Sequence, residues 1–505
     1  MSILSKKSTF LLALAVALYA FILNEYNNKV IRKLYPKNDS IHNNELVHNS
    51  TVYNIDNYWY TQQIKNYVKG NGFTIDPQKE KYEVRRTPIY PLFYGVHYLL
   101  FGEIGSYYLI RFTQIALFVL SVFALLYATY NFTQNKFIAI TSAIFYGFNP
   151  SIVCYLYYTI TEALSPALVC FMLYYLSKGY RQNRRQDWIV SGLFFAIASL
   201  CRPAIFFIAP GILVLIIYTN KHSIKRIIFQ GSFFVFGAAI LFVPHMIRNY
   251  QITNDIIVLE KFYEDPMDYG MPNIALREWI SCWTNPADYS SESISNRIGS
   301  TVLSANKISF DKEMFIENEI NRLPQQAFIA NSKDNVQAAF STLYDYYYYK
   351  RKLLNTTLAD SVGKISLNQL HALKNEFIQK EPVRYYILKP ILFFKSILFQ
   401  SNSSQLIFLK QYPNTWIEKA IKGPLYLWNI YLFVSILGMF LFYKKHFALQ
   451  SLTILYLSGL IVYTVFMFNY FEVRYLIPIF PLMYVMGTIF FVEMYGKIKR
   501  VYTSK

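Results

Sequence analysis

Seven charged residues that could bind a phosphate or transfer a proton lie at the ends of the chain's apolar stretches. They are Asp56, Arg86, Glu162, Arg202, Arg248, Glu472 and Arg474. Arginine presents a planar fork of donors that matches phosphate oxygens, and it keeps its charge when partly desolvated. A carboxylate is the simplest base for the hydroxyl of an acceptor. Because ionisable groups at a membrane are costly, these residues are the first candidates for function.

The composition is that of a polytopic membrane protein. Of the 505 residues, 54% are hydrophobic, 18% are aromatic and only 16% are charged, which is too apolar for a basic soluble protein. The sequence predicts an all-α fold with about ten transmembrane helices, interfacial helices and a mainly helical extracytoplasmic domain. The predicted spans are 8–24, 106–130, 137–154, 162–176, 188–200, 203–218, 227–247, 425–443, 447–468 and 475–495, several of them shorter than the roughly 20 residues of a perpendicular helix.

The distribution of basic residues predicts the orientation. Short cytoplasmic loops are rich in Lys and Arg. The segments 1–7, 133–136, 178–187, 221–226, 444–446 and 496–505 hold 16 basic residues and one acidic residue, and so carry +15 of the net charge of +19. Both termini are therefore expected in the cytoplasm, and the candidate charges on the opposite side. Topology explains the basic excess, so nucleic acid is not expected as a partner. The first span is expected to be an uncleaved anchor, although it could be read as a secretory signal.

Three parts are predicted along the chain. Residues 1–248 form a transmembrane catalytic module that includes an extracytoplasmic loop, 25–105. Residues 249–384 form an extracytoplasmic domain with helices between 333 and 380, and residues 385–505 hold an interfacial helix and the C-terminal transmembrane helices. In the first loop we expect an amphipathic helix over 54–69 with Asn54 as its N-cap, and an interfacial or re-entrant helix that ends at Phe101. The acidic group Glu260, Glu264, Asp265 and Asp268 is interpreted as a solvated face.

Familiar nucleotide, hydrolase and metal motifs are absent from the sequence. It contains no Walker loop, GxGxxG fingerprint or GxSxG elbow. The four cysteines and seven histidines show no metal-ligand spacing. No cofactor is predicted, although Asp56 and Glu162 could share a divalent metal if they converge.

The excess of arginine over acidic residues points to a phosphate at the membrane. If the phosphate belongs to a polyprenyl carrier, the lipid tail can lie among the apolar spans. A lipid phosphate is a weak base and leaves readily, so sugar transfer from it needs cations near the developing charge and a base for the acceptor hydroxyl. Asp56 is the candidate base. Taken singly, each arginine could also be a membrane-edge anchor, and each acid a helix-start residue.

The order of the motifs resembles that of a known superfamily. An acidic residue in the first outer loop is followed by an RxPxYP-like segment (86–91), Thr161-Glu162, Arg202-Pro203, a PxxxRN segment (244–249) and RYLIPIFP (474–481). Together they resemble the GT-C glycosyltransferases, in particular bacterial relatives of dolichyl-phosphate-mannose protein mannosyltransferases and of lipid A aminoarabinose transferases.

The resemblance implies a polyprenyl-phosphate-linked sugar donor, inverting transfer and an active site on the extracytoplasmic face of a bacterial inner membrane. The acceptor would be a protein, a glycan or a lipid. We predict Asp56 and Glu162 as catalytic residues. The predicted donor-phosphate ligands are Arg86, Arg202, Arg248, Arg474 and Tyr475.

Two departures leave the donor sugar and the acceptor open. Asp56 is followed by Asn57 where the protein mannosyltransferases have Asp-Glu, and Arg86-Thr87-Pro88 stands where the aminoarabinose enzymes have Lys-Pro-Pro. The alternatives are a transporter or flippase of lipid-linked saccharides and a polysaccharide polymerase or ligase. Transporters commonly show internal repeats and ionisable groups near the bilayer midplane, and this sequence shows neither.

Overall fold

The computed structural model describes residues 3–34, 56–79, 81–261, 271–284, 294–295, 297–298, 312–399, 406–442, 446–468 and 472–503. Its regular elements within these ranges are all helices, as predicted. The chain divides into two compact units. The larger comprises Met1–Lys261, Gln400–Gly459 and Val473–Lys505, and the smaller comprises Phe262–Phe399 and Leu460–Glu472. The predicted domain 249–384 overlaps the smaller unit, and its boundaries stay a proposal.

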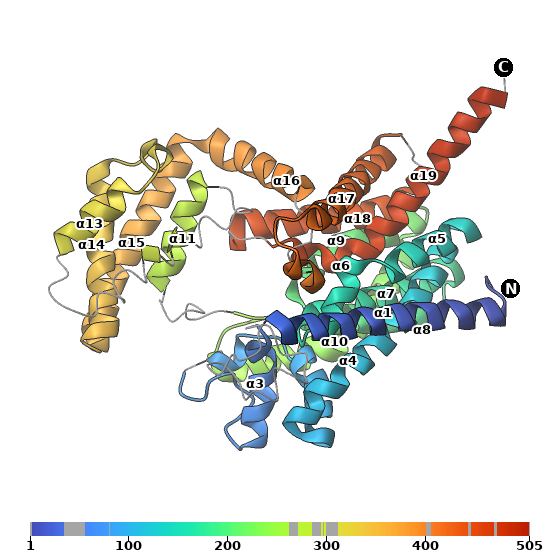
Figure 1. Ribbon diagram of the computed structural model, residues 1–505, viewed down its shortest axis with the longest axis horizontal. Coiled ribbons are helices and arrows are strands. Elements are labelled where there is room, and N and C mark those ends of the chain that lie inside the picture. Colours follow the sequence, from blue (N-terminus) through green and yellow to red (C-terminus); the bar gives the residue numbers. More distant parts are fainter. Residues whose placement is uncertain are drawn as a thin grey trace. The chain divides into compact units, whose positions relative to one another are not determined.

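The larger unit is a bundle of long helices (Figure 1). Within it, α7 packs against α4 and α8, α10 packs against α8, and α19 packs against α5 and α17. Its α-helices are α1 Lys6–Leu34, α3 Asn57–Val68, α4 Ile89–Thr133, α5 Lys136–Gly147, α6 Pro150–Val153, α7 Ser165–Gln182, α8 Arg185–Cys201, α9 Ala209–Thr219, α10 Ile224–Thr253, α17 Trp416–Phe442, α18 Phe447–Val462, whose last residues fall in the smaller unit, and α19 Phe480–Thr503. Short 3-10 helices are η1 Tyr82–Val84, η2 Cys154–Tyr157, η3 Thr161–Ala163, η4 Pro203–Ile208, η10 Ile407–Gln411 and η13 Val473–Ile479.

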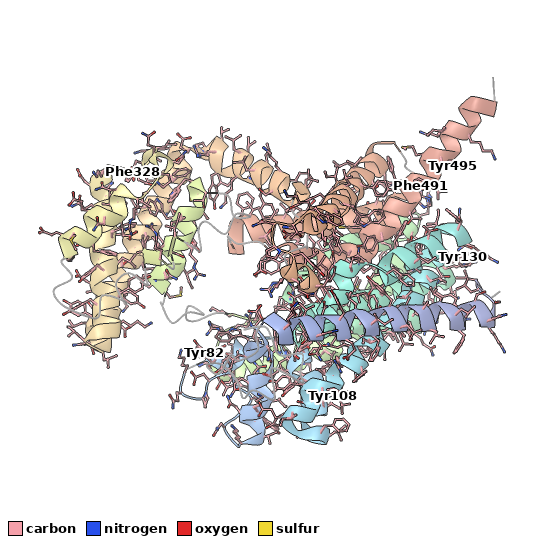
Figure 2. All side chains as sticks on the ribbon, viewed as in Figure 1. Tyr82, Tyr108, Tyr130, Phe328, Phe491 and Tyr495 are labelled. Carbon is pink, nitrogen blue, oxygen red and sulfur yellow. The ribbon has the colours of Figure 1, made fainter. Side chains whose placement is uncertain are left out.

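Six of the described helices are long and apolar enough to cross a membrane, and the bent pair Lys136–Gly147 and Pro150–Tyr157 adds a seventh if it is one span. The chain is thus an integral membrane protein. Large side chains such as Phe491 and Tyr495 of α19 are exposed (Figure 2), as expected where a helix faces lipid. Of the predicted spans, 162–176, 188–200 and 203–218 fall on α7, α8 and α9, which have 18, 17 and 11 residues. The predicted total of ten transmembrane helices stays a prediction.

Helix α4 is broken at Gly102. The backbone of Gly102 has φ 67° and ψ −173°, a conformation that only glycine adopts readily. Residues 89–101 therefore form a helix of their own before the span predicted at 106–130. Leu92, Val96 and Leu99 on this helix are exposed. A separate helix is confirmed here, and its position at the membrane interface stays a prediction.

Helix α3 buries polar residues and exposes aromatic ones. It starts at Asn57, so Asp56 holds the N-cap position that the sequence analysis assigned to Asn54, a residue outside the described ranges. The prediction was wrong by two residues because the amphipathic pattern does not mark the first turn. The polar residues Asn57, Thr61, Gln63 and Asn66 are buried, whereas Tyr58, Tyr67 and Val68 are exposed.

The smaller unit has its own hydrophobic core. Its helices are α11 Met271–Trp283, α13 Lys312–Asn321, η6 Gln325–Phe328, α14 Lys333–Tyr347, α15 Thr356–Lys380, α16 Lys389–Phe399 and three π-helical turns, Tyr348–Lys352, Arg384–Leu388 and Tyr463–Phe468. Helices α11 and α14 pack against α15, and α14 and α15 confirm the helices expected between 333 and 380. The buried Trp279 donates to Asn331 Oδ1 at 2.8 Å, which satisfies the indole N–H within the core.

Two glycines allow α8 and α10 to touch through their backbones. A Cβ atom at Gly192 of α8 would lie 2.0 Å from the carbonyl oxygen of Phe234, and one at Gly237 of α10 would lie 1.9 Å from that of Ile189. Small residues at such contacts are a general device for close packing of membrane helices. The close contact holds α8, and with it the residues that follow α8, against α10.

The first prediction concerns this contact. Replacing Gly237 by Ala should destabilise the larger unit by about 1–3 kcal/mol, because the added methyl group meets backbone atoms that cannot move aside. The matched control is Gly231→Ala on the same helix, where a Cβ meets nothing within 4 Å. It should be neutral or stabilising by up to about 1 kcal/mol. Thermal unfolding of the purified variants in detergent compares them, and equal melting temperatures would contradict the proposed contact.

Candidate functional site

A buried carboxylate, Glu162, lies at the centre of a charged cluster in the larger unit. Its Oε1 atom is 3.0 Å from Arg202 Nη1 and 3.5 Å from Arg474 Nε. Its Oε2 atom accepts a hydrogen bond of 3.1 Å from the hydroxyl of Thr161, which in turn accepts one of 2.8 Å from Arg202 Nη1. Only 2% of the Glu162 side chain is exposed. Removing a carboxylate from water is costly unless cations compensate it, and here two guanidinium groups do so.

Asp56 joins the same cluster through Arg474. Arg474 Nη1 donates to Asp56 Oδ2, so one guanidinium bridges two carboxylates that are 106 positions apart in the sequence. The Asp56 side chain makes no capping hydrogen bond at the start of α3. The structure thus brings together four residues that the sequence named separately: Asp56, Glu162, Arg202 and Arg474.

Local backbone signals explain why the two arginines reach this place. Arg202 follows the last residue of α8 and is extended, with φ −144° and ψ 108°, because the residue before a proline is driven out of the helical region. Arg474 lies in η13, directly before α19. Between them stands Tyr475, whose ring centre is 5.3 Å from the guanidinium carbon of Arg202 and 5.9 Å from that of Arg474.

A second ion pair involves Arg86 and a residue that the sequence analysis misjudged. Arg86 Nη1 lies 3.5 Å from Glu260 Oε1, and the Glu260 side chain is only 14% exposed. The interpretation of Glu260 as part of a solvated face was therefore wrong, while the other members of that group lie outside the described residues. Burial raises the pKa of the Glu260 carboxyl above its usual range, and the neighbouring Arg86 offsets this only in part.

Aromatic rings surround the arginines that precede α4. The guanidinium carbon of Arg86 is 5.7 Å from the ring centre of Tyr60. That of Arg85 is 4.6 Å from the ring of Trp59 and 4.5 Å from that of Tyr82. Such contacts stabilise partly desolvated cations, and they attach the segment before α4 to α3.

Arg248 has different partners from the other predicted ligands. Its guanidinium donates to the backbone oxygens of Glu83 and Phe73, at 3.2 to 3.3 Å, and to the side-chain oxygen of Asn249 at 3.2 Å. These bonds fasten Phe73 and Glu83 to the end of α10. The role of Arg248 as a phosphate ligand remains a prediction, and the structure shows it as a support of the loop that leads to Arg86.

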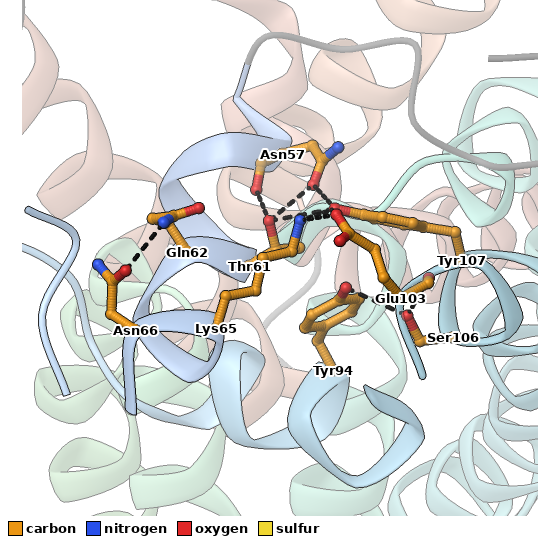
Figure 3. Close-up of polar contacts among 9 residues, drawn as sticks. All are labelled: Asn57, Thr61, Gln62, Lys65, Asn66, Tyr94, Glu103, Ser106 and Tyr107. Carbon is orange, nitrogen blue, oxygen red and sulfur yellow. Dashed lines mark hydrogen bonds and ion pairs between the residues drawn. The ribbon is translucent and has the colours of Figure 1, made fainter. Parts of the chain in front are cut away.

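A polar network holds the first turn of α3 against α4 (Figure 3). The hydroxyl of Tyr107 accepts from Lys65 Nζ at 3.1 Å and lies 3.5 Å from Asn57 Oδ1 and 3.4 Å from Thr61 Oγ1. Lys65 also pairs with Glu103, next to the break in α4. Because Asn57 follows Asp56 directly, this network positions Asp56.

No group of three or more His, Cys, Asp or Glu side chains in the described ranges is arranged to hold a metal ion. Instead, the cluster balances charges of opposite sign. The cations Arg86, Arg202 and Arg474 face the carboxylates Asp56, Glu162 and Glu260. A ligand that carries a phosphate would therefore compete with carboxylates for the arginines.

A family model matches part of the chain. Residues 85–247 match the family model described as dolichyl-phosphate-mannose-protein mannosyltransferase, and this segment contains Arg86, Glu162 and Arg202. The match confirms the resemblance expected from the sequence. A search of curated protein sequences gives no match.

The chain is also similar, at low identity, to a solved structure. It is the crystal structure of ArnT from Cupriavidus metallidurans bound to undecaprenyl phosphate. The similarity covers 96% of this chain and 78% of that one, with 12% identity and a TM-score of 0.36. A likeness at this score does not define a shared fold.

The second prediction concerns the buried ion pair. Replacing Arg202 by Met should destabilise the chain by about 3–5 kcal/mol, because Glu162 would lose its nearest cation while staying buried. The double variant with Arg202→Met and Glu162→Leu should recover part of this loss, since no isolated charge remains. Melting temperatures in detergent measure both. If the Arg202→Met variant were as stable as the wild type, the ion pair between Arg202 and Glu162 would not support the fold.

Proposed function

We propose that the chain is an integral-membrane glycosyltransferase that moves a sugar from a polyprenyl-phosphate donor to an acceptor on the extracytoplasmic side. The observation that carries this proposal is the sharing of Arg474 between Asp56 and Glu162, with Arg202 and Tyr475 beside it. The match of residues 85–247 to a mannosyltransferase family supports the class of reaction. The acceptor would be a protein, a glycan or a lipid.

In the proposed site the arginines bind the donor phosphate. Arg474, Arg202 and Arg86 supply guanidinium groups, which fit phosphate oxygens in a bidentate manner. As the bond between the sugar and the phosphate breaks, negative charge grows on the phosphate oxygens. Cations that are already in place stabilise this charge without reorganising. Tyr475 orients two of them through its ring.

The proposed base is Asp56. The acceptor oxygen attacks the anomeric carbon on the face opposite to the phosphate, so that the configuration at this carbon inverts. The new C–O bond forms while the old one breaks, the electron pair leaves with the lipid phosphate, and the hydroxyl proton passes to Asp56. While Arg474 pairs with Asp56, its guanidinium occupies the carboxylate oxygen Oδ2. A phosphate that draws Arg474 away would free this oxygen to accept the hydroxyl proton, which couples donor binding to the proposed proton transfer.

The role that we propose for Glu162 differs from that of Asp56. It is more deeply buried than Asp56, with 2% against 27% of the side chain exposed, and it contacts both Arg202 and Arg474. These contacts suit a carboxylate that keeps two arginines together rather than one that meets an acceptor. We place Glu162 in the catalytic site as the group that orients the phosphate-binding arginines.

The proposed location is the bacterial inner membrane, with the site on the extracytoplasmic face. Support comes from the short basic loops, which indicate the cytoplasmic side. The basic segment 178–187 contains the end of α7 and the start of α8, and both Glu162 and Arg202 lie at the opposite ends of these two helices. Residues at those ends are therefore expected on the outer side.

The third prediction tests the base. Asp56→Asn should lower the rate of sugar transfer by at least about 10²–10⁴-fold, because the amide cannot take the proton. Expression and melting temperature should change little, since the amide still accepts a hydrogen bond from Arg474. Transfer is measured with purified protein and a radiolabelled polyprenyl-phosphate sugar.

The matched control for this experiment is Asp76→Asn. Asp76 lies in the same loop, and its carboxylate accepts a hydrogen bond from the backbone of Gln78, outside the cluster. This variant should retain activity. Full transfer by Asp56→Asn would rule out Asp56 as the base, and movement of the lipid-linked sugar across a liposome membrane without transfer would instead identify a flippase.

A further inference from the structure

The segment 255–261 folds back along the end of α10 and is anchored on both sides of Glu260. On one side, His245 Nε2 donates to the carbonyl oxygen of Leu259 at 2.7 Å. On the other, the backbone N–H of Lys261 donates to the carbonyl oxygen of Val84 at 3.1 Å. The adjacent Asn249 side chain donates to the oxygen of Ile257 at 3.0 Å. These three hydrogen bonds on either side of one acidic residue give it a defined position.

This position places the Glu260 carboxylate against the arginines of the site. It lies 3.5 Å from Arg86 Nη1, and Arg85 and Arg202 also act on it electrostatically. The backbone of Thr87 also forms a hydrogen bond with the Glu260 carboxylate. Lys261, the next residue, pairs instead with Asp255 at 2.8 Å and is about half exposed. The segment thus presents one carboxylate inward and keeps its other charges outside.

We infer that Glu260 is a further positioning residue of the site, which competes with the donor phosphate for Arg86 and takes up a proton when the donor binds. The inference rests on the proposed function, because it assumes that Arg86 contacts a phosphate. Two anions beside one guanidinium repel each other, so the carboxylate must lose its charge or move away. The hydrogen bonds at Leu259 and Lys261 restrain movement of the Glu260 carboxylate. We therefore expect the carboxylate to lose its charge by taking up a proton.

The direction of the pH dependence follows from this competition. Burial already raises the pKa of Glu260, and Arg86 lowers it in part. A bound phosphate weakens the effect of Arg86 and adds a negative charge, so the pKa of Glu260 is higher in the complex than in the free protein. By linkage, donor binding becomes stronger as the pH falls through this pKa. The arginines around Glu260 stay charged throughout, and His245 is the titratable group beneath the segment.

The fourth prediction measures binding of a probe whose own charge is constant. A methyl phosphodiester of a short polyprenol keeps one negative charge, whereas a phosphomonoester titrates near pH 6. With the full-length protein in detergent, wild-type affinity should rise about tenfold from pH 8 to pH 5. Glu260→Gln should show no such rise, and at pH 8 it should bind the probe about tenfold more tightly than the wild type.

Three further variants complete the experiment. Glu260→Asp should keep the pH dependence of binding. Glu260→Met is a second uncharged variant, which replaces Glu260→Gln in the comparison if the Gln variant does not fold. Asp255→Asn removes the same charge from the same segment without touching Arg86, and should behave as the wild type. Weaker or unchanged binding by the uncharged variants, with the same pH dependence, would overturn the inference about Glu260 alone. Failure of the wild type to bind the probe at any pH would overturn the proposed function as well.

Discussion

The site depends on one constraint. Charged side chains that are largely shielded from water must be neutralised by side chains of opposite charge. Glu162 is buried, and it is stable there because Arg202 and Arg474 contact it. Arg474 in turn reaches Asp56. These contacts connect the start of α3, the turn before α7, the end of α8 and η13. The same interactions that hold four distant segments together bring together the groups that we propose as phosphate ligands and base.

Charge balance gives the cluster its chemical character. Three arginines and three carboxylates of the described structure compensate one another, and in the proposed reaction a phosphate replaces a carboxylate as the partner of an arginine. Asp56 and Glu260 occupy the two ends of this arrangement, paired with Arg474 and Arg86. In the proposed reaction Asp56 is released from Arg474 to accept the hydroxyl proton, and Glu260 gains a proton when the donor arrives. Binding and proton transfer would then be linked by electrostatics, without a large conformational change.

Much of this could be predicted from the sequence, and the exceptions have physical reasons. Residue types and their order identified the separate members of the cluster, because the arginines beside Pro203 and at the start of RYLIPIFP stand out at the ends of apolar helices. Their pairing could not be predicted, since it depends on how helices far apart in sequence pack. Glu260 was misjudged because its burial depends on anchors at Leu259 and Lys261. Arg248 has the same residue type and setting as Arg202, yet backbone oxygens occupy its guanidinium. The number of spans could not be predicted from length alone, because helices such as α8, with 17 residues, are shorter than a perpendicular span.

The most direct test of this account is an experimental structure of the chain with a polyprenyl phosphate bound. The account predicts the phosphate within hydrogen-bond distance of Arg474 and Arg86, with the contact between Arg474 and Asp56 lengthened beyond a hydrogen bond and Glu162 still held by Arg202. A phosphate bound elsewhere, with the pairs between Arg474 and Asp56 and between Arg86 and Glu260 intact, would contradict it.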